Sequence, residues 1–412
     1  SVAAGMQGTM PGVTIKSATG RPGQDDSAGS IRVRGTGTFN NASPMIVVDG
    51  MESTLYDIDP NDIESISVLK DAASAAIYGS KAANGVIVVT TKRGKAGKSK
   101  ISYSGTLGWQ SPTRLAKYVS SADYARLTNE ARNNEGLPDM YTEEDIRLFE
   151  NGTDPDGHPN TDWLGLLYDN SGLQTQHNLN INGGSEGIRY MVSTGYTHQE
   201  GLIRNNSKDK YNLRLNLDSK ITEKLDAAFS LVFSREDIDY PAHPVDRNDD
   251  EFFGLITKLS PMVPCYKSNG DYGYIGDGNP IAWLDSGIKK TIMRDNMQGV
   301  GSLKYQILPE LSIKALGAYK LYIGETHSPK SMVRYSDDFT HGSTFKITEN
   351  YYRDDRVSGE ILLEYRKTFK QSHNLGVLAG YHAELYRNYS LTGYRENFPN
   401  QDLTDLNAGG TF

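Results

Sequence analysis

The sequence predicts a mostly β protein in which a small α/β domain precedes part of a transmembrane antiparallel β-barrel. Three observations support this fold class. Residues 62–94 follow a strand–helix–strand pattern, residues 101–412 contain long strands of alternating apolar and polar side chains, and the connections between those strands alternate between long and short. We therefore expect residues 1–97 to form a plug domain and residues 98–412 to form about nine strands of a larger barrel.

The α/β pattern is clearest in residues 62–94. An extended run at 63–69 precedes Asp71, whose carboxylate can cap the first turn of an alanine-rich helix at 72–78. The run 86–91 is β-branched throughout, as expected of a strand that is buried on both faces. A glycine after the helix and an Asn-Gly pair before the last strand provide the turns: Gly79, Asn84 and Gly85.

The chain before this unit is small, rich in glycine and interrupted by turns. We expect short strands at 13–16 and 30–34, followed by a loop. The strand 45–48 leads into Asp49-Gly50, a dipeptide that strongly favours a two-residue β-hairpin. We assign structural roles in the plug to the following residues: Arg34, Gly35, Asp49, Gly50, Asp71, Tyr78, Gly79, Asn84 and Gly85.

The composition excludes several classes of protein. The chain has 43 basic and 51 acidic side chains, so it lacks the excess of positive charge that is typical of nucleic-acid-binding proteins. No apolar run approaches the roughly 18 residues that a spanning helix requires, whereas barrel strands alternate and keep the mean hydropathy low. Cys265 is the single cysteine, so it forms neither an internal disulfide nor a metal site by itself. Residues 1–3 lack the pattern of a signal peptide, so we expect either a processed start or a fragment.

The strands expected after residue 100 have one apolar and one polar face. In residues 211–218, for example, Tyr and Leu alternate with Asn, Arg and Asp. Alternation of this kind fits a soluble sandwich with one solvated face as well as a barrel with lipid outside and water inside. We place the strands at 101–110, 174–184, 187–198, 210–218, 224–235, 294–308, 311–323, 351–369 and 373–389.

Loop lengths favour the barrel. Long connections at 111–173, 236–293 and 324–350 alternate with short ones at 185–186, 219–223, 309–310 and 370–372, and 199–209 is intermediate. Outer-membrane barrels have short turns on one side and long loops on the other, whereas a sandwich has no reason to sort its loops in this way. Bacterial barrels have even strand numbers, so about nine strands indicate a portion of a larger barrel, with 391–412 in an outer loop. An amphipathic stretch at 122–134 predicts a helix within the first long loop.

Clusters that suggest catalysis or metal binding are weak. The acidic segment 154–162 lacks the ligand spacing of a calcium loop, and a solvated loop explains the acidic residues at 246–251 better than a glycosidase pair does. His243, His327 and His341 have no metal-binding spacing. We therefore expect no catalytic residues, no metal site and no cofactor, and a protein that is not an enzyme.

A series of segments, in order along the chain, points to a known family. They are GVTIKSATGRPGQ, SIRVRGTGTFN, PMIVVDGM, DPNDIESISVLKDAASAAIYGSKAANGVIVVTTKRG, TDW at 161–163, NLNINGG at 178–184 and YNLRLNLDSKI at 211–221. With these segments the chain resembles the SusC/RagA family of TonB-dependent outer-membrane transporters over most of its length. The resemblance implies the outer membrane of a Gram-negative bacterium, energy supplied through TonB, and a SusD-like surface lipoprotein as partner. It also implies that an N-terminal TonB box is missing from this chain.

The resemblance implies binding and import of a nutrient. We expect an oligosaccharide, because aromatic rings cover apolar sugar faces and polar groups meet hydroxyls, but oligopeptides fit the same kind of surface. A surface adhesin or glycan-binding β protein without transport is an alternative of another class, although it needs no internal plug. The candidate substrate-binding residues are Phe39, Asn40, Asn41, Trp283, Tyr272 and Tyr274.

Overall fold

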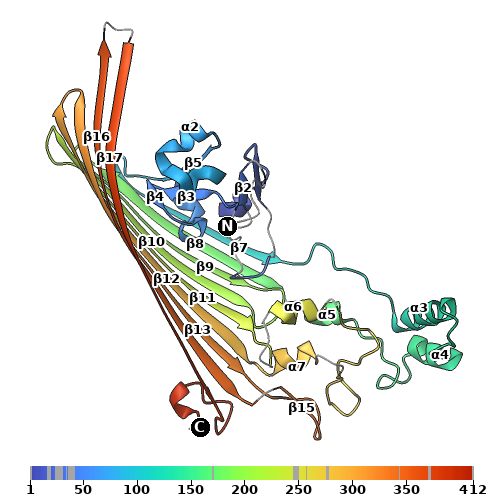
Figure 1. The fold of residues 1–412 in the computed structure, drawn as a ribbon. Helices are drawn as coiled ribbons and strands as arrows, with labels where there is room; N and C mark the ends of the chain where they lie inside the picture. Colours follow the sequence, from blue (N-terminus) through green and yellow to red (C-terminus); the bar gives the residue numbers. More distant parts are fainter. Residues whose placement is uncertain are drawn as a thin grey trace.

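The fold consists of a long, twisted sheet with a small domain against one face (Figure 1). The computed structural model describes residues 2–15, 20–23, 31–33, 35, 42–168, 171–244, 250–256, 258–274, 278–342, 344–369 and 373–410. Among these residues, no helix is long and apolar enough to cross a membrane.

The largest element is a nine-stranded antiparallel sheet in which each long strand pairs with the long strands before and after it. Its strands are β7 (Gly97–Gln110), β8 (Gly172–Gly184), β9 (Ile188–Glu200), β10 (Ser207–Lys220), β11 (Leu225–Pro241), β12 (Lys289–Leu308), β13 (Leu311–Lys330), β16 (Lys346–Phe369) and β17 (His373–Glu396). β7 and β17 are the two edges, so this sheet is an open part of a barrel. The nine predicted strands are confirmed.

Several predicted strand ends were wrong. The long loops expected at 236–293 and 324–350 are shorter, because β11 continues to Pro241, β12 begins at Lys289, β13 continues to Lys330 and β16 begins at Lys346. Residues 391–396 do not belong to an outer loop, because β17 continues to Glu396. The reason is that β16 begins earlier than predicted, at Lys346, and its first residues pair with this part of β17.

The faces of the sheet have the polarity of a membrane barrel. In β10 the apolar Tyr211 and Leu213 are 45% and 40% exposed, whereas Asn212, Arg214 and Asn216 are almost fully buried. Polar side chains thus face the plug and apolar ones face outward, the reverse of a soluble protein.

The connections also follow the predicted asymmetry. At one end of the sheet the turns are short, and at the other end the loops carry their own secondary structure (Figure 1). These elements are α3 (Ser121–Asn134), α4 (Glu143–Asn151), α5 (Trp163–Leu167), α6 (Asp250–Ile256), α7 (Pro280–Asp285), β14 (Val333–Arg334) and β15 (Thr340–His341). The helix predicted at 122–134 is confirmed as α3.

The plug is a small α/β domain. A four-stranded sheet has the order β4 (Met51–Glu52), β3 (Met45–Val48), β6 (Val86–Thr91) and β5 (Ile63–Leu69), with β3 and β6 parallel. The remaining elements are α1 (Val2–Met6), β1 (Val13–Ile15), β2 (Ile31–Val33), η2 (Leu55–Asp57), η3 (Pro60–Asp62), α2 (Ala72–Ala75) and η4 (Ala76–Asn84). A last short turn, η5 (Leu406–Ala408), follows β17.

The strand β6 is buried on both faces, as its β-branched sequence predicts. Ile87 and Val89 pack on one side with α1 and β1, and Val86 packs on the other side with Val47 and the alanines of α2 and η4. Burial of apolar side chains on two faces of one strand is what holds so small a domain together.

Turn chemistry explains the hairpin before this strand. Val48 pairs directly with Met51, and Asp49 and Gly50 have φ values of 50° and 92°. Positive φ at both central residues defines the hairpin turn that Asp-Gly favours, so this prediction is confirmed.

The predicted helix at 72–78 is shorter in the structure. α2 ends at Ala75, and the following 3₁₀ segment is broken at Gly79, where φ is 68° and ψ is −157°. Only glycine adopts this backbone conformation readily, which explains why the chain changes direction there. The backbone carbonyl of Asp71 accepts a hydrogen bond from the amide of Ala75 in the first helical turn.

Candidate binding site between the plug and the sheet

Buried charges fix the plug to the polar face of the sheet. Arg214 in β10 lies 3.5 Å from the carboxylate of Asp49 and 3.4 Å from that of Asp62, and all three side chains are at most 7% exposed. Asp49 also accepts hydrogen bonds from the amide and hydroxyl of Thr91 at 3.0 and 2.6 Å. The Asp49-Gly50 hairpin and the end of β6 are thus both held against the sheet by contacts that involve Arg214. Because these charges are desolvated, loss of one partner leaves the others uncompensated.

The chain leaving the plug is held by the same strand. The Asn216 amide donates to the Thr91 hydroxyl at 3.1 Å and to the Lys92 carbonyl at 2.8 Å, and Arg93 forms a 2.8 Å ion pair with Asp218. A Cβ atom on Gly94 would lie 2.3 Å from the backbone nitrogen of Tyr190 in β9. Only glycine lets the plug and wall approach so closely here.

A cavity of about 570 Å³ lies between the plug and the sheet, on the long-loop side of the Arg214 contacts. Successive strands place three rows of inward-facing residues across its floor, and all of these residues except Gly324, Asn388 and Gln298 line the cavity. The first row has Glu236, Arg294, Gly324 and Tyr352; the second has Ser234, Asn296, Tyr322, Asp354 and Asn388; the third has Gln298, Lys320, Arg356 and Tyr386. Since alternate residues of a strand share a face, these rows are neighbours.

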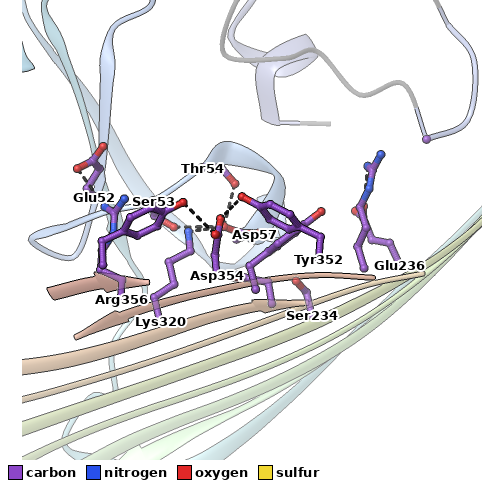
Figure 2. Close-up of a pocket in the computed structure, with 15 residues that line it drawn as sticks. Glu52, Ser53, Thr54, Asp57, Ser234, Glu236, Lys320, Tyr352, Asp354 and Arg356 are labelled. Carbon is purple, nitrogen blue, oxygen red and sulfur yellow. Dashed lines mark hydrogen bonds and ion pairs between the residues drawn. The ribbon is translucent and has the colours of Figure 1, made fainter. Parts of the chain in front are cut away.

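Ion pairs connect the plug edge of the cavity to the floor. Figure 2 shows Lys320 and Arg356 extending from the strands toward the segment that carries Glu52 and Asp57. Lys320 lies 3.3 Å from Asp57, and Arg356 lies 3.2 Å from Glu52, which also pairs with Lys81 of η4 at 2.9 Å. Burial opposes ionisation of Glu52, but its contacts with Lys81 and Arg356 outweigh it and lower the pKa of this carboxyl. The cavity wall and the plug are thus electrostatically linked.

Tyrosine rings on the floor are held by one carboxylate. Asp354 accepts hydrogen bonds from the hydroxyls of Tyr352 and Tyr386 at 2.5 and 2.9 Å, and from the Asn388 amide at 2.7 Å. The Tyr322 ring packs edge-on against Tyr352 with centroids 5.8 Å apart. Fixed rings beside hydrogen-bonding groups are suited to a ligand that has both apolar and polar surface.

The candidate residues named from the sequence do not line this cavity in the part of the chain that is described. Phe39, Asn40, Asn41 and Arg34 lie outside the described residues. Trp283 is 1% exposed in the core formed by the long loops, where its indole donates to the Tyr335 hydroxyl at 2.6 Å. Tyr272 donates to Asp285 at 3.0 Å, and Tyr274 is 44% exposed with its ring against Phe339. These three loop residues lie together at the outer end of the sheet.

Sequence reasoning missed the floor residues because they come from five separate strands, β11, β12, β13, β16 and β17. A signal was present: in β12, Arg294, Asn296 and Gln298 alternate with Asp295 and Met297. Alternation gives the face of each residue, but only the register between strands shows which inward-facing residues are neighbours.

The acidic and histidine clusters occupy separate places. Asp154 caps a turn at Gly157, Asp156 accepts from Ser268, and Asp162 caps α5. Asp246 and Asp249 lie outside the described residues, and Asp250 begins α6. His243 packs against Trp283, His327 contacts Glu349, and His341 is in β15. Within the described ranges, no group of three potential ligands is placed to hold a metal ion.

His158 predicts a pH-dependent contact in the first long loop. Its two ring nitrogens lie 2.7 Å from Asp154 and 3.1 Å from Asp145 of α4, with Glu144 nearby, and its ring packs on Phe149. The hydrogen bond to Asp154, followed by that to Asp145, raises the pKa of His158. The folded loop therefore binds the proton more tightly than the unfolded loop. We expect the stabilisation to be complete below pH ~6.5 and to be lost as the pH rises through the raised pKa.

Hydrogen exchange of α4 amides, measured across this pH range and corrected for intrinsic rates, tests the expectation. Protection should decrease with rising pH in the native sequence and become independent of pH in His158→Ala. A native profile as flat as that of the variant would contradict it.

Comparisons with known proteins agree with this architecture. Residues 1–86 match the family model of the TonB-dependent receptor plug domain. The chain is 32% identical over 314 residues to TonB-dependent receptor P26 of Formosa agariphila, covering 73% of this chain and 29% of that protein. It is 27% identical over 418 residues to TonB-dependent receptor SusC of Bacteroides thetaiotaomicron, covering 93% and 39%. The RagAB peptide transporter superposes with a TM-score of 0.80 at 22% identity, covering 99% of this chain and 48% of that one.

The chain thus spans less than half the length of these relatives. The match to the plug-domain family, the curated relatives and the shared fold all support the family resemblance that the ordered sequence segments indicate. This chain is a SusC/RagA-like TonB-dependent receptor, a class of protein located in the outer membrane of Gram-negative bacteria.

Proposed function

We propose that the protein is an outer-membrane active importer of an oligosaccharide, powered through TonB and working with a SusD-like lipoprotein. The observation that supports this most is the cavity between plug and sheet, whose floor combines fixed tyrosine rings with hydrogen-bonding side chains. Its position on the long-loop side matches a ligand that arrives from outside the cell. Loops of this length, with a core of their own, provide a surface on which a lipoprotein can dock.

Import requires that ligand binding affects the plug. Lys320 and Arg356 line the cavity and also pair with Asp57 and Glu52 of the plug. A ligand that changes the position of these two cations alters contacts that hold the plug edge. A pull transmitted through TonB then acts on a domain whose attachment has been weakened, and local displacement opens the path.

Oligopeptides are the second candidate substrate. Acidic and basic side chains alternate around the cavity, with Glu236 beside Arg294 and Asp57 beside Lys320. Opposite charges at short spacing suit a chain with an ammonium and a carboxylate end. The fold is also shared with the RagAB peptide transporter.

Purification of the native-length protein from outer membranes tests the proposal. We expect a SusD-like lipoprotein to co-purify, and we expect cells to take up a fluorescent oligosaccharide only when both this protein and TonB are present. Uptake of labelled peptides alone would assign the peptide alternative. Binding of a ligand without TonB-dependent uptake would indicate an adhesin and overturn the transport proposal.

A further inference from the structure

We propose that Asn296 recognises a neutral sugar unit at the floor of the cavity. This inference rests on the proposed import function and makes its substrate class more specific. Asn296 lies in β12, in the second row of the floor, between Ser234 and Tyr322. It is 4% exposed and lines the cavity.

The side-chain amide of Asn296 has unused hydrogen-bonding capacity. Neither its oxygen nor its nitrogen has a hydrogen-bond partner among the described residues. Buried polar groups in proteins are nearly always paired, and the exceptions are concentrated at positions with a function. An amide offers one acceptor and one donor side by side, which matches two neighbouring hydroxyl groups of a sugar.

The charged groups around the cavity are, in contrast, already engaged. The charge of Glu236 is balanced by Lys210 at 3.3 Å and Arg294 at 3.7 Å, although its Oε1 atom accepts no hydrogen bond among the described residues, and the carboxylate of Asp354 accepts three hydrogen bonds. The other two acidic side chains of the lining, Glu52 and Asp57, pair with Arg356 and Lys320. A charged ligand would have to take these groups from their partners, whereas a neutral one forms hydrogen bonds with the free amide and contacts Lys320 and Arg356 without replacing their ion pairs. The charge pattern therefore favours a neutral oligosaccharide over uronic acids, sulfated sugars and peptides.

The neighbouring rings complete the recognition of a sugar. Tyr322 shares a row with Asn296, and its ring packs on Tyr352, which Asp354 holds in place. A sugar unit whose hydroxyls meet the amide places its apolar face near these rings. Since Asn296 is almost buried, small groups such as hydroxyls reach it more easily than a bulky side chain does.

Binding to the native-length protein in detergent tests this assignment. The probes are short maltooligosaccharides, xylooligosaccharides and mannooligosaccharides as neutral ligands, oligogalacturonides as anionic ligands, and mixed tetrapeptides. We expect a neutral oligosaccharide to bind. Asn296→Ala should weaken it by about tenfold, as expected for loss of hydrogen bonds to a neutral group. Asn296→Asp keeps the size and an acceptor but loses the donor, and should also bind more weakly.

Asn180→Ala is the matched control. Asn180 in β8 also has a buried amide nitrogen without a hydrogen-bond partner in the described chain, but it does not line the cavity. Its substitution should leave affinity unchanged, and heat-modifiable migration of all three variants checks their folding. Equal affinity of Asn296→Ala and the native protein overturns the role of Asn296. Binding of only oligogalacturonides or peptides, or of no probe, overturns the neutral-sugar inference. TonB-dependent uptake of any labelled substrate would still uphold the import function.

Discussion

Replacing Arg214 with alanine is expected to detach the plug from the barrel wall while the wall stays folded. Arg214 is the cation next to both Asp49 and Asp62. Its removal leaves two buried carboxylates without their ion-pair partner, supported only by Thr91, Ser193 and Lys92 in the described part of the chain. Breaking a buried ion pair by removing one partner destabilises by roughly 3–5 kcal/mol, which is large compared with the stability of a small domain. Hydrogen exchange of the amides of β3 and β6, measured in the native-length protein in detergent, should accelerate strongly.

Two further variants separate charge from packing. Arg214→Lys retains the charge but loses the forked geometry, so its plug should have intermediate protection. Arg235→Ala removes an arginine from the neighbouring strand whose side chain is 45% exposed and pairs with Asp237, and should have an effect below ~1 kcal/mol. Equal protection of the plug in the native protein and Arg214→Ala would show that the plug is held by other contacts.

Acidification gives an independent check on the same contact. Burial raises the pKa of Asp62, although Ser193 and Arg214 favour its charged form. The folded state therefore binds this proton more tightly than the unfolded state, so lowering the pH toward the raised pKa stabilises the fold. Without Arg214 this effect should be larger, and the variant should regain part of its protection as the pH falls.

The architecture was readable from the sequence because local rules determine it. A strand between lipid and water must alternate, so the faces of β10 follow directly from its residues. Asp49-Gly50 specifies its turn because few residue pairs tolerate positive φ at both positions. The strand ends were less accurate, since the length of β16 and β17 depends on pairing with each other rather than on either sequence alone.

The candidate site was not readable in the same way. Asn296, Tyr322 and Asp354 are neighbours only because β12, β13 and β16 pair in a particular register. No single segment of the sequence contains a motif that indicates the cavity. The side of the cavity that faces the sheet is formed by plug residues far away in the sequence. The loop aromatic residues present the opposite case. They resemble ligand-binding residues in composition, but Trp283 is buried because three long loops pack together, which their separate sequences do not show.

Replacing Trp283 with alanine is expected to unfold the outer loops and not to act through direct loss of a ligand contact. Trp283 is among the largest fully buried side chains, and its core includes Trp163 of α5, Phe252 of α6 and Tyr335 beside β14. Truncating a buried tryptophan costs about 3–5 kcal/mol through lost burial and the cavity left behind. The hydrogen bond from its indole to Tyr335 is lost as well. Limited proteolysis of the native-length protein should then cleave residues 242–288 and 331–345 much faster.

The conservative variant and a surface tryptophan distinguish a structural role from a binding role. Trp283→Phe keeps most of the buried ring and loses the hydrogen bond to Tyr335, so proteolysis should increase only moderately. Trp109→Ala removes a side chain that is 65% exposed on β7 and should leave the loops resistant. If Trp283 instead contacted the substrate, Trp283→Ala would weaken binding while its loops stayed as resistant as those of the native protein. That outcome is not expected of a side chain with 1% of its surface exposed, because almost none of it is accessible to a ligand while the loop core is intact.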